Sequence, residues 1–389
     1  MSVTEQLRGQ VGHGLERVRE RVAGLLQRHF VRTQILVTGS CGKSTAVRYL
    51  GAILDGRGSV QVHGHPNNDK HLLRPHRRHR RPVDFLVQEA SAYGPGALEP
   101  VARTLRIDIV VITAVGLDHA SNYRATGIEP LDAVALEKGR LAAAVHPGGT
   151  VCLNADDPRV AAMASRCRAR VLTFGTTDGA DYRATNIVAD WRNGIRLDLS
   201  VDGRTYPISA RLPSPLLVPS LLGALAAAHA AGVALETAIE RVAATEPQPQ
   251  HMSTHIGADG RAYVFDTYKA SQWSTERLLD TLRSVSGGPV TLVLGDISDM
   301  GNNNSSKYRR LIRQAAAVAD EVILTAGSAR HGARLRDEGL ANLVLAERLE
   351  EVVASIARSS NQVILLKSNG SAHLERVARV VGIQLPPHP

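Results

Sequence analysis

The apolar positions of this chain alternate between short runs and helical stretches. From Thr33 to about Ala244, apolar runs are separated by segments in which apolar and polar residues follow helical spacing. Strands that alternate with helices in this way predict a parallel sheet with helices on both faces. The predicted strands are 35–38, 85–88, 109–113, 151–154 and 171–174.

The pattern changes twice towards the C-terminus. Residues 181–210 are typical of antiparallel strands around the turn Asp202-Gly203, and the Ala/Leu-rich stretch 216–231 predicts a buried helix. The polar, proline-bearing segment 245–250 is typical of a linker. A second αβ alternation follows, with predicted strands at 263–266, 290–294, 321–324 and 363–366.

A different pattern occupies the N-terminal residues. Six apolar residues recur at helical spacing between arginines and glutamates: Leu7, Val11, Leu15, Val18, Val22 and Leu25. This predicts an amphipathic helix whose apolar side packs on the body of the protein. Membrane binding is the alternative, disfavoured because Glu16 and Glu20 interrupt the basic face.

These patterns together predict an α/β fold. A central domain at 33–244 carries the mostly parallel sheet and a phosphate-binding loop, and a smaller Rossmann-like α/β domain follows at 245–389. The N-terminal helix at 1–32 precedes both. No apolar run approaches the roughly 20 residues of a membrane span, and no signal-peptide pattern is present, so we expect a cytoplasmic protein without a membrane partner.

Charge and cysteine content exclude some classes of function. Three scattered cysteines (Cys41, Cys152 and Cys167) have no metal-ligand spacing. The net charge is +9, and much of the excess lies in the run 70–81, which contains no aromatic residue for base stacking. Nucleic acid is therefore an unlikely partner. The run fits either a loop that holds an anionic substrate or a solvated surface loop.

Residues 35–45 carry the most informative chemistry. The sequence Ile-Leu-Val-Thr-Gly-Ser-Cys-Gly-Lys-Ser-Thr places a glycine turn, a lysine and two hydroxyls between a predicted strand and a predicted helix. Backbone N–H groups of such a turn converge on phosphate oxygens, Lys43 adds charge, and Ser44 can ligate Mg²⁺. The expected ligand is ATP or GTP, held by residues 39–45: Gly39, Ser40, Cys41, Gly42, Lys43, Ser44 and Thr45.

Polar residues also follow two other predicted strands. Glu89 follows 85–88, and Asp118-His119 follows 109–113 after a short turn. Open α/β sheets bind ligands at the carboxyl ends of their strands. A carboxylate and an imidazole beside a triphosphate suit Mg²⁺ ligation or the ordering of a water molecule.

In order along the chain, these motifs resemble those of the Mur ligase superfamily. Its members are ATP-dependent amide-forming enzymes, among them the muropeptide ligases, folylpolyglutamate synthase and the poly-γ-glutamate and cyanophycin synthetases. The resemblance covers most of the chain from Gln34. The paired asparagines of 65–69 are similar to those in a loop of the muropeptide ligase that adds D-Ala-D-Ala. The matching segments are 37–45, 65–69, 89–96, 113–119, 137–140, 153–157, 266–271, 294–301 and 366–371.

The resemblance implies a mechanism and a set of site residues. A carboxylate would attack the γ-phosphate of ATP, and an amine would then attack the acyl phosphate. Two Mg²⁺ ions are implied, one held by Ser44 and Glu89 and the other by Glu89, His119 and a carbamylated Lys138. Asp266 and Lys269 would orient the ribose and the acyl phosphate or amine. Further implied contacts are Asn154 to the nucleotide, and Asn67, Asn68, Arg77, Arg78, Lys367 and Ser368 to the substrate.

Three departures from the family pattern qualify this expectation. Only the helix of residues 1–30 precedes the phosphate loop, where muropeptide ligases carry a UDP-sugar domain, so UDP-muramoyl peptide is not the expected substrate. Pro219-Ser-Leu-Leu-Gly223 replaces the His-Asn-x-x-Asn motif that helps to place adenine, and Gln250-His251 replaces an arginine.

We therefore expect an ATP-dependent carboxylate–amine ligase that acts on a small molecule or short peptide. One alternative is an amidating ligase that uses ammonia from a glutaminase partner. The other is a catalytically degenerate protein that binds nucleotide as a scaffold.

Overall fold

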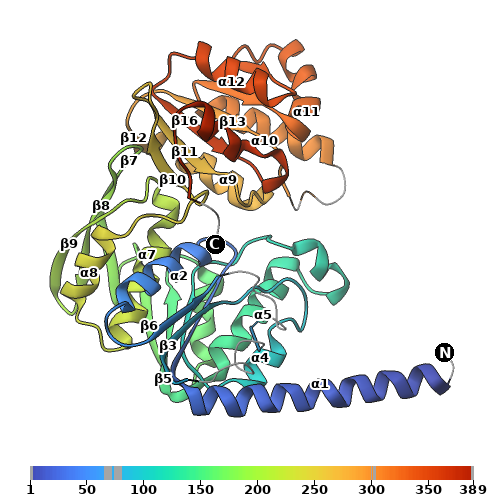
Figure 1. Cartoon of the computed structure of the whole chain (residues 1–389), viewed down its shortest axis with the longest axis vertical. Helices are drawn as coiled ribbons and strands as arrows, with labels where there is room; N and C mark the ends of the chain where they lie inside the picture. Colours follow the sequence, from blue (N-terminus) through green and yellow to red (C-terminus); the bar gives the residue numbers. More distant parts are fainter. Residues whose placement is uncertain (1–2, 65–71, 74–80, 299, 301–303, 387–389) are drawn as a thin grey trace. The chain divides into compact units, whose positions relative to one another are not determined.

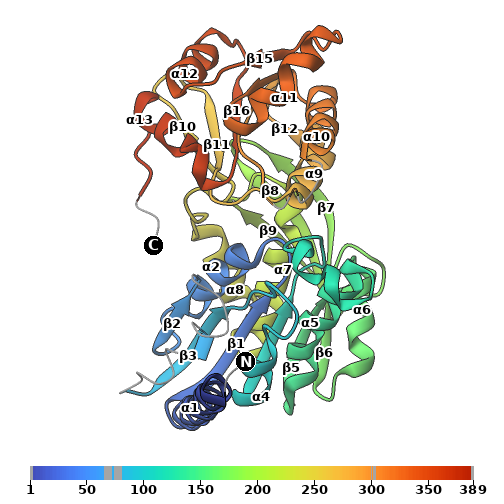
Figure 2. The same cartoon turned by 90° about the vertical axis from the view of Figure 1, so that its right-hand side faces the viewer.

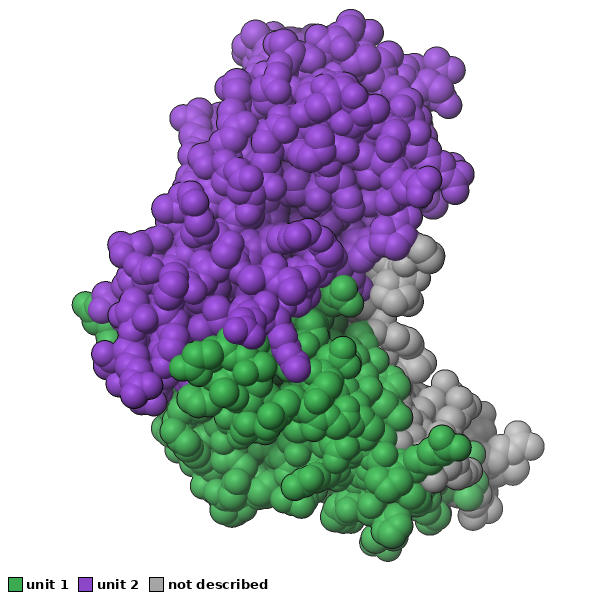
Figure 3. All heavy atoms as spheres, turned by 60° about the vertical axis from the view of Figure 1, so that its left-hand side comes forward, with its two compact units in different colours: residues 1–115, 122–180, 222–238 green, residues 116–121, 181–221, 239–389 purple. Residues whose placement is uncertain are grey.

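The computed structural model describes residues 3–64, 72–73, 81–298, 300 and 304–386, with side chains from residue 14 onward except Ala120. Figure 3 colours its two compact units. Unit 1 comprises residues 1–115, 122–180 and 222–238, and unit 2 comprises residues 116–121, 181–221 and 239–389. No helix in the described part of the chain is both long and apolar enough to cross a membrane.

Unit 1 contains a parallel sheet with the strand order β2-β3-β1-β4-β5-β6; β3, β5 and β6 are labelled in Figure 1, and β1 and β2 in Figure 2. The five predicted strands of this sheet are confirmed, and β2 is an addition. The strands are β1 (Val31–Thr38), β2 (Val60–His63), β3 (Val83–Glu89), β4 (Ile107–Ile112), β5 (Val145–Asn154) and β6 (Arg170–Gly175).

Helices connect these strands. They are α1 (Val3–Phe30), α2 (Lys43–Leu54), α4 (Glu99–Thr104), α5 (Pro130–Ala144) and α6 (Pro158–Ala161), with the 3₁₀ segments η2 (Ala120–Thr126) and η3 (Ala162–Arg166). Two further helices, α7 (Val218–Ala230) and α8 (Leu235–Ala244), each cross a point where the two units divide.

Alternating strand residues supply two apolar faces to the sheet of unit 1. One face, with Leu36, Val110 and Leu153, joins a buried cluster with residues of α4 and α5. On the other face, α7 lies so close that a Cβ added to Gly223 would come within 2.7 Å of the Val111 side chain. Helices therefore cover both faces, as expected for a parallel sheet.

The N-terminal helix is confirmed, but the side on which it packs was predicted wrongly. Four of its apolar residues face solvent, with exposed fractions of 55% for Leu15, 58% for Val18, 42% for Val22 and 63% for Leu25. The buried side carries Ala23, Gly24 and Gln27 instead, and packs against α4 and β1 (Figure 2).

Two features explain this choice of side. Gly24 has no side chain, and a Cβ there would lie 2.6 Å from the carbonyl oxygen of Thr104. The Gln27 amide donates to the Arg106 carbonyl at 2.9 Å and accepts from the Arg106 N–H at 3.2 Å. Close backbone approach and a two-way hydrogen bond therefore fix the helix, rather than its apolar stripe.

Unit 2 contains an antiparallel segment and a smaller α/β sheet. The predicted antiparallel strands are confirmed as β7 (Tyr182–Asp190), β8 (Gly194–Val201) and β9 (Arg204–Ala210). Their second turn, Asp202-Gly203, has φ of 48° and 75°, and two positive φ angles are the signature of a type I′ hairpin turn. The short strand β12 (Val285–Ser286) pairs with β7.

The smaller sheet has the order β10-β11-β16-β13-β14-β15, parallel except for β10. Its four predicted strands are confirmed, and β10 and β15 are additions. The strands are β10 (Ser253–Ile256), β11 (Ala262–Asp266), β13 (Val290–Leu294), β14 (Glu321–Leu324), β15 (Leu343–Leu345) and β16 (Val363–Lys367). The helices are η4 (Pro215–Leu217), α9 (Gln272–Thr281), η5 (Leu282–Ser284), α10 (Asn304–Val318), α11 (Ala326–Asp337), α12 (Leu349–Arg358), η6 (Gly370–Ala372), η7 (Leu374–Arg376) and α13 (Val377–Val380).

We predict opposite effects for two glycine substitutions in α1. Gly24→Ala should destabilise the packing of α1, because overpacking against Thr104 costs about 1–3 kcal/mol and the gain in helix propensity recovers only about 1 kcal/mol. Gly14→Ala is the matched control, because a Cβ there meets no atom of the described residues within 4 Å and only the propensity gain remains. Amide hydrogen exchange across 14–30 should become faster in the first variant and slower in the second. Equal protection in both would contradict this packing.

Candidate active site

A glycine turn joins β1 to α2 in unit 1. Gly42 has φ of 77°, in the left-handed region, and directly precedes the helix. Gly39 has φ of 156°, and a Cβ at that position would overlap the Thr113 hydroxyl. The first bond of the helical ladder runs from the Ala46 N–H to the Gly42 carbonyl, so the N–H groups of the preceding residues have no intrahelical acceptor.

The turn is fastened to the end of β4. The Ser40 N–H donates to the Ala114 carbonyl at 2.9 Å, and the Thr113 hydroxyl donates to the Cys41 carbonyl at 2.6 Å. The sequence suggested no such role for Thr113. Its position in the sheet could have indicated this role. Because β1 and β4 are neighbours, a hydroxyl that follows β4 lies beside the turn that follows β1.

Three predicted residues meet directly at this turn. The Ser44 hydroxyl donates to Glu89 Oε2 at 2.8 Å, and Lys43 Nζ lies 3.8 Å from Glu89 Oε1. Lys43 Nζ also donates to the Gly39 carbonyl at 2.9 Å. Lys43 and Glu89 are both buried, so the structure places a paired lysine and carboxylate beside a helix N-terminus.

The motif Glu137-Lys138 lies on α5. Glu137 is buried and accepts from the backbone N–H groups of Gly96 at 2.9 Å and Leu98 at 2.7 Å, and from Arg140 Nε at 3.1 Å. It therefore fixes the loop that follows Glu89, a positioning role that the sequence did not reveal. Lys138 is also buried, with 2% of its surface exposed.

Asn154 ties the end of β5 to the end of β4. Its amide donates to the Thr113 carbonyl at 2.8 Å, and its carbonyl oxygen accepts from the Asp156 N–H at 3.0 Å. Asp157 adds a second tie, because it accepts from the Val115 N–H at 2.7 Å. These side chains hold the strand ends in register.

A second group of predicted residues lies in unit 2. Lys269 Nζ donates to both carboxylate oxygens of Asp118, at 2.8 and 3.0 Å, and lies 3.4 Å from His119 Nε2. His119 has a left-handed φ of 57°. Since an ammonium repels a cation, ligation of Mg²⁺ by this imidazole nitrogen requires Lys269 to move away.

A third group lies at the carboxyl ends of the strands of unit 2. Asp266 and Lys367 are paired in register on β11 and β16, and their side chains form an ion pair at 2.6 Å. Lys367 is 3% exposed and also donates to the Lys269 carbonyl at 3.0 Å. The Ser368 hydroxyl accepts from the Asp296 N–H at 3.0 Å.

Some predicted elements of the site cannot be placed or do not form a ligand cluster. Asn67, Asn68, Arg77 and Arg78 lie outside the described residues. Among the described residues, no three His, Cys, Asp or Glu side chains are grouped so that they could hold a metal ion. None of the three cysteines forms a disulfide, and burial raises the pKa of Cys152 to about 12.

Two protein families match consecutive parts of the chain. The Mur ligase middle domain matches residues 37–228, and the Mur ligase glutamate ligase domain matches residues 250–370. The chain belongs to the Mur ligase superfamily. The interval between the two matches contains the predicted domain boundary at 244/245.

Individual relatives agree with this placement. The chain is 27% identical to the UDP-N-acetylmuramoyl-tripeptide–D-alanyl-D-alanine ligase of Mycobacterium tuberculosis over 325 residues, which cover 78% of this chain and 61% of the relative. It is 31% identical to the UDP-N-acetylmuramate–L-alanine ligase of Salinispora arenicola over 56% of this chain. The chain thus spans about three fifths of the length of the first of these curated relatives.

Solved structures share the Mur ligase fold. MurF of Acinetobacter baumannii superposes with a TM-score of 0.79 at 19% identity, over 93% of this chain and 79% of that one. Folylpolyglutamate synthase of Thermotoga maritima superposes with a TM-score of 0.65 at 14% identity, over 95% of this chain and 94% of that one.

Two of the three departures from the Mur ligase pattern have structural counterparts here. Gly223 packs so tightly on the sheet that a Cβ would lie 2.7 Å from Val111 and 3.0 Å from the Phe174 ring, which leaves no room for an asparagine. Gln250 instead braces the loop after β11, since its carbonyl accepts from the N–H groups of Thr267 and Tyr268. The His251 ring stacks on Tyr268 at 4.7 Å.

The residues at the phosphate loop fit a Mg²⁺ ion. Ser44 and Glu89 supply hard oxygen donors that already lie within hydrogen-bonding distance of each other. Mg²⁺ commonly binds through one or two protein oxygens together with phosphate and water. A Mg²⁺ ion at this site would therefore not need a larger cluster of protein ligands.

We predict that Glu137 contributes more to stability than a neighbouring glutamate. Glu137→Gln replaces one acceptor oxygen by an NH₂ group that faces a backbone N–H, and should lower the free energy of unfolding by about 1–3 kcal/mol. Glu99→Gln is the matched control, because Glu99 is exposed and lies 3.8 Å from the same Arg140. Glu99→Gln should lower the free energy of unfolding by less than about 1 kcal/mol. If urea unfolding shows the same decrease in the free energy of unfolding for both variants, Glu137 does not fix the loop.

Proposed function

We propose that this protein is an ATP-dependent ligase that joins a carboxylate to an amine through an acyl phosphate. The observation that carries the proposal is the group formed by Lys43, Ser44 and Glu89 at the start of α2. It occurs in a chain that matches both catalytic domains of the Mur ligases.

The proposed first step is phosphoryl transfer. A carboxylate oxygen of the substrate bonds to the γ-phosphorus, and the bond from that phosphorus to the β–γ bridging oxygen breaks, releasing ADP. Negative charge is concentrated there, so catalysis depends on neutralising it. Lys43 and the N–H groups at the start of α2 would bind the phosphates, while Ser44 and Glu89 would hold the metal ion. Mg²⁺ bound there would supply further positive charge.

The proposed second step forms the amide. The amine nitrogen bonds to the acyl carbon, and phosphate leaves with the oxygen that joined carbon to phosphorus. The proton that the amine loses in this step goes to the departing phosphate, directly or through water. We assign Asp266 to the ribose and Lys269 to the acyl phosphate or amine. A second Mg²⁺ at His119 and carbamylation of Lys138 also belong to this proposal, and the burial of Lys138 is compatible with either of its chemical states.

We propose a small molecule or a short peptide as the carboxylate substrate. The Mycobacterium relative is named for a UDP-N-acetylmuramoyl tripeptide, which makes that compound the natural comparison. Amino acids and short peptides are the proposed amines. Ammonia from a glutaminase is the alternative source of nitrogen, for which the comparisons give no support.

We predict hydroxamate formation that depends on Lys43. Purified protein is given Mg-ATP or Mg-GTP, hydroxylamine and a panel of carboxylates that includes amino acids, short peptides and a UDP-muramoyl tripeptide. Hydroxylamine intercepts the acyl phosphate, so no knowledge of the amine is needed. Lys43→Ala and removal of Mg²⁺ should each abolish the product. Arg48→Ala removes an exposed cation from the same helix and should have little effect.

The outcome of this assay separates the remaining alternatives. A hydroxamate from the UDP-muramoyl tripeptide alone would overturn the small-molecule assignment but not the ligase. Amide formation with ammonium in preference to amino acids would favour the amidating alternative. Tight ATP binding without hydroxamate across the panel would favour the scaffold alternative.

We predict that nucleotide affinity depends on the Thr113 hydroxyl. Thr113→Val keeps the shape of the side chain but removes the bond to the Cys41 carbonyl. Loss of one such hydrogen bond should weaken Mg-ATP binding by about 5- to 15-fold. Thr113→Ser retains the hydroxyl and should bind within about twofold of the wild type, a difference worth less than about 0.5 kcal/mol. Titration calorimetry measures both, and equal affinities for the two variants would contradict the role of the hydroxyl.

A further inference from the structure

The helix α1 has an apolar stripe that no described part of the protein covers. Leu15, Val18, Val22 and Leu25 are spaced by three, four and three residues, and each is at least 42% exposed. The apolar stripe of a surface helix usually packs against the core of the protein. An exposed apolar patch of this kind marks an interaction surface.

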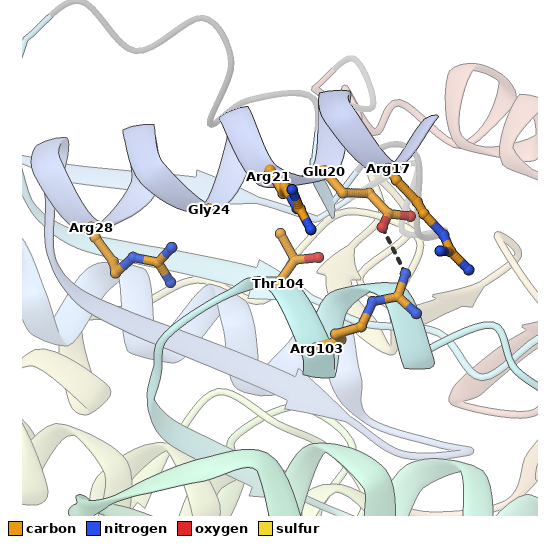
Figure 4. A pocket seen from close by; sticks show the side chains of 7 residues that line it. All are labelled: Arg17, Glu20, Arg21, Gly24, Arg28, Arg103 and Thr104. Atoms are coloured by element: carbon orange, nitrogen blue, oxygen red, sulfur yellow. Dashed lines mark hydrogen bonds and ion pairs between the residues drawn. The ribbon is translucent and has the colours of Figure 1, made fainter. Parts of the chain in front are cut away.

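A row of arginines lies along one edge of this stripe. Arg17, Arg21 and Arg28 line a pocket of about 480 Å³ between α1 and α4, together with Arg103 (Figure 4). Arg103 is paired with Glu20 at 2.7 Å. No ion pair joins Arg17, Arg21 or Arg28 to any carboxylate whose side chain the structure describes.

Helical geometry places these residues on distinct faces. At about 100° per residue, Arg17, Arg21 and Arg28 fall between the buried side around Gln27 and the apolar stripe. Arg19 falls on the opposite edge of the stripe. Glu20 turns towards Arg103, so it does not interrupt the basic edge as its position in the sequence suggested.

We propose that this face of α1 docks on an anionic lipid bilayer. The apolar side chains would enter the boundary between headgroups and acyl chains, and the arginines would bind lipid phosphates. A helix with an apolar stripe, basic flanks and low net hydrophobicity is the type that lies in a membrane interface. The helix would lie parallel to the surface, held to the body of unit 1 through Gly24 and Gln27.

Two other occupants fit the same face less well. A second copy would place arginines opposite arginines on both edges of the stripe, which repel each other. A partner helix with acidic flanks would need a longer heptad pattern. The apolar residues alternate between steps of four and three residues only from Val11 to Leu25, about two heptads, because Leu7 lies a further four residues before Val11. Coiled coils usually extend over three or four heptads.

The experiment is vesicle flotation of the full chain. Vesicles of phosphatidylglycerol and phosphatidylcholine in equal parts are compared with vesicles of phosphatidylcholine alone. We expect the protein to float with the anionic vesicles at least tenfold more than with the neutral ones, and less as salt rises. The combined variant Leu15→Gln, Val18→Gln, Val22→Gln and Leu25→Gln should float with the anionic vesicles at least tenfold less than the wild type. Its four sites are exposed, so thermal unfolding of the variant should match the wild type.

Matched controls test whether flotation depends on this face of α1 rather than on exposed apolar residues or positive charge in general. Ile256→Gln with Val380→Gln removes two exposed apolar residues from unit 2, which are 53% and 60% exposed, and should leave flotation unchanged. Arg17→Gln, Arg21→Gln and Arg28→Gln together should reduce flotation with the anionic vesicles. Arg166→Gln, Arg168→Gln and Arg170→Gln remove the same charge from exposed sites of unit 1 and should have a much smaller effect.

Several results would overturn the proposal. These are absence of flotation with anionic vesicles, flotation that the four glutamine substitutions do not reduce, and equal loss in the two arginine triples. Sedimentation that shows a dimer, abolished by the glutamine variant and without flotation, would assign the face to a second copy. Binding of a helical peptide with glutamates flanking a leucine stripe, again without flotation, would assign it to a protein partner.

Discussion

The closure of the phosphate loop on its neighbouring strand is the constraint on which the site depends. β1 and β4 run parallel and in register to Thr38 and Ile112, so their carboxyl ends meet at one edge of the sheet. Gly39 fits against Thr113 only because it lacks a side chain. On the other side of β1, the register pairs Val37 with Glu89. The same parallel register thus brings the glycine turn, its anchoring hydroxyl and the carboxylate to one place.

The sequence predicted this arrangement as far as local patterns reach. Apolar runs identified the strands of both sheets, and the glycine-lysine-serine motif identified the loop with Lys43 and Ser44. The side chains that fasten this loop and the loop after Glu89 were not predicted, because Thr113 and Glu137 act through backbone atoms far away in the sequence. A threonine at a strand end and a glutamate on a helix have no distinctive pattern of their own.

The N-terminal helix shows a second limit of pattern reading. Its amphipathic spacing correctly predicted a helix, but spacing alone does not state which side meets the protein. That choice followed from Gly24, which permits close approach to Thr104, and from the paired amide contacts of Gln27. Both residues lie opposite the apolar stripe. The side of the helix that carries Gly24 and Gln27 therefore packs on the protein, because close backbone contact there satisfies buried hydrogen-bonding groups.

The cations of the candidate site are already balanced, which constrains what can bind. Lys43 lies near Glu89, Lys367 is paired with Asp266, and Lys269 is paired with Asp118. A triphosphate that approached any one of these three pairs would meet a carboxylate as well as an ammonium, so the net electrostatic attraction would be small. A divalent cation at Ser44 and Glu89 changes this balance, because it neutralises the carboxylate and leaves Lys43 available for phosphate. Metal and nucleotide should therefore bind together rather than independently.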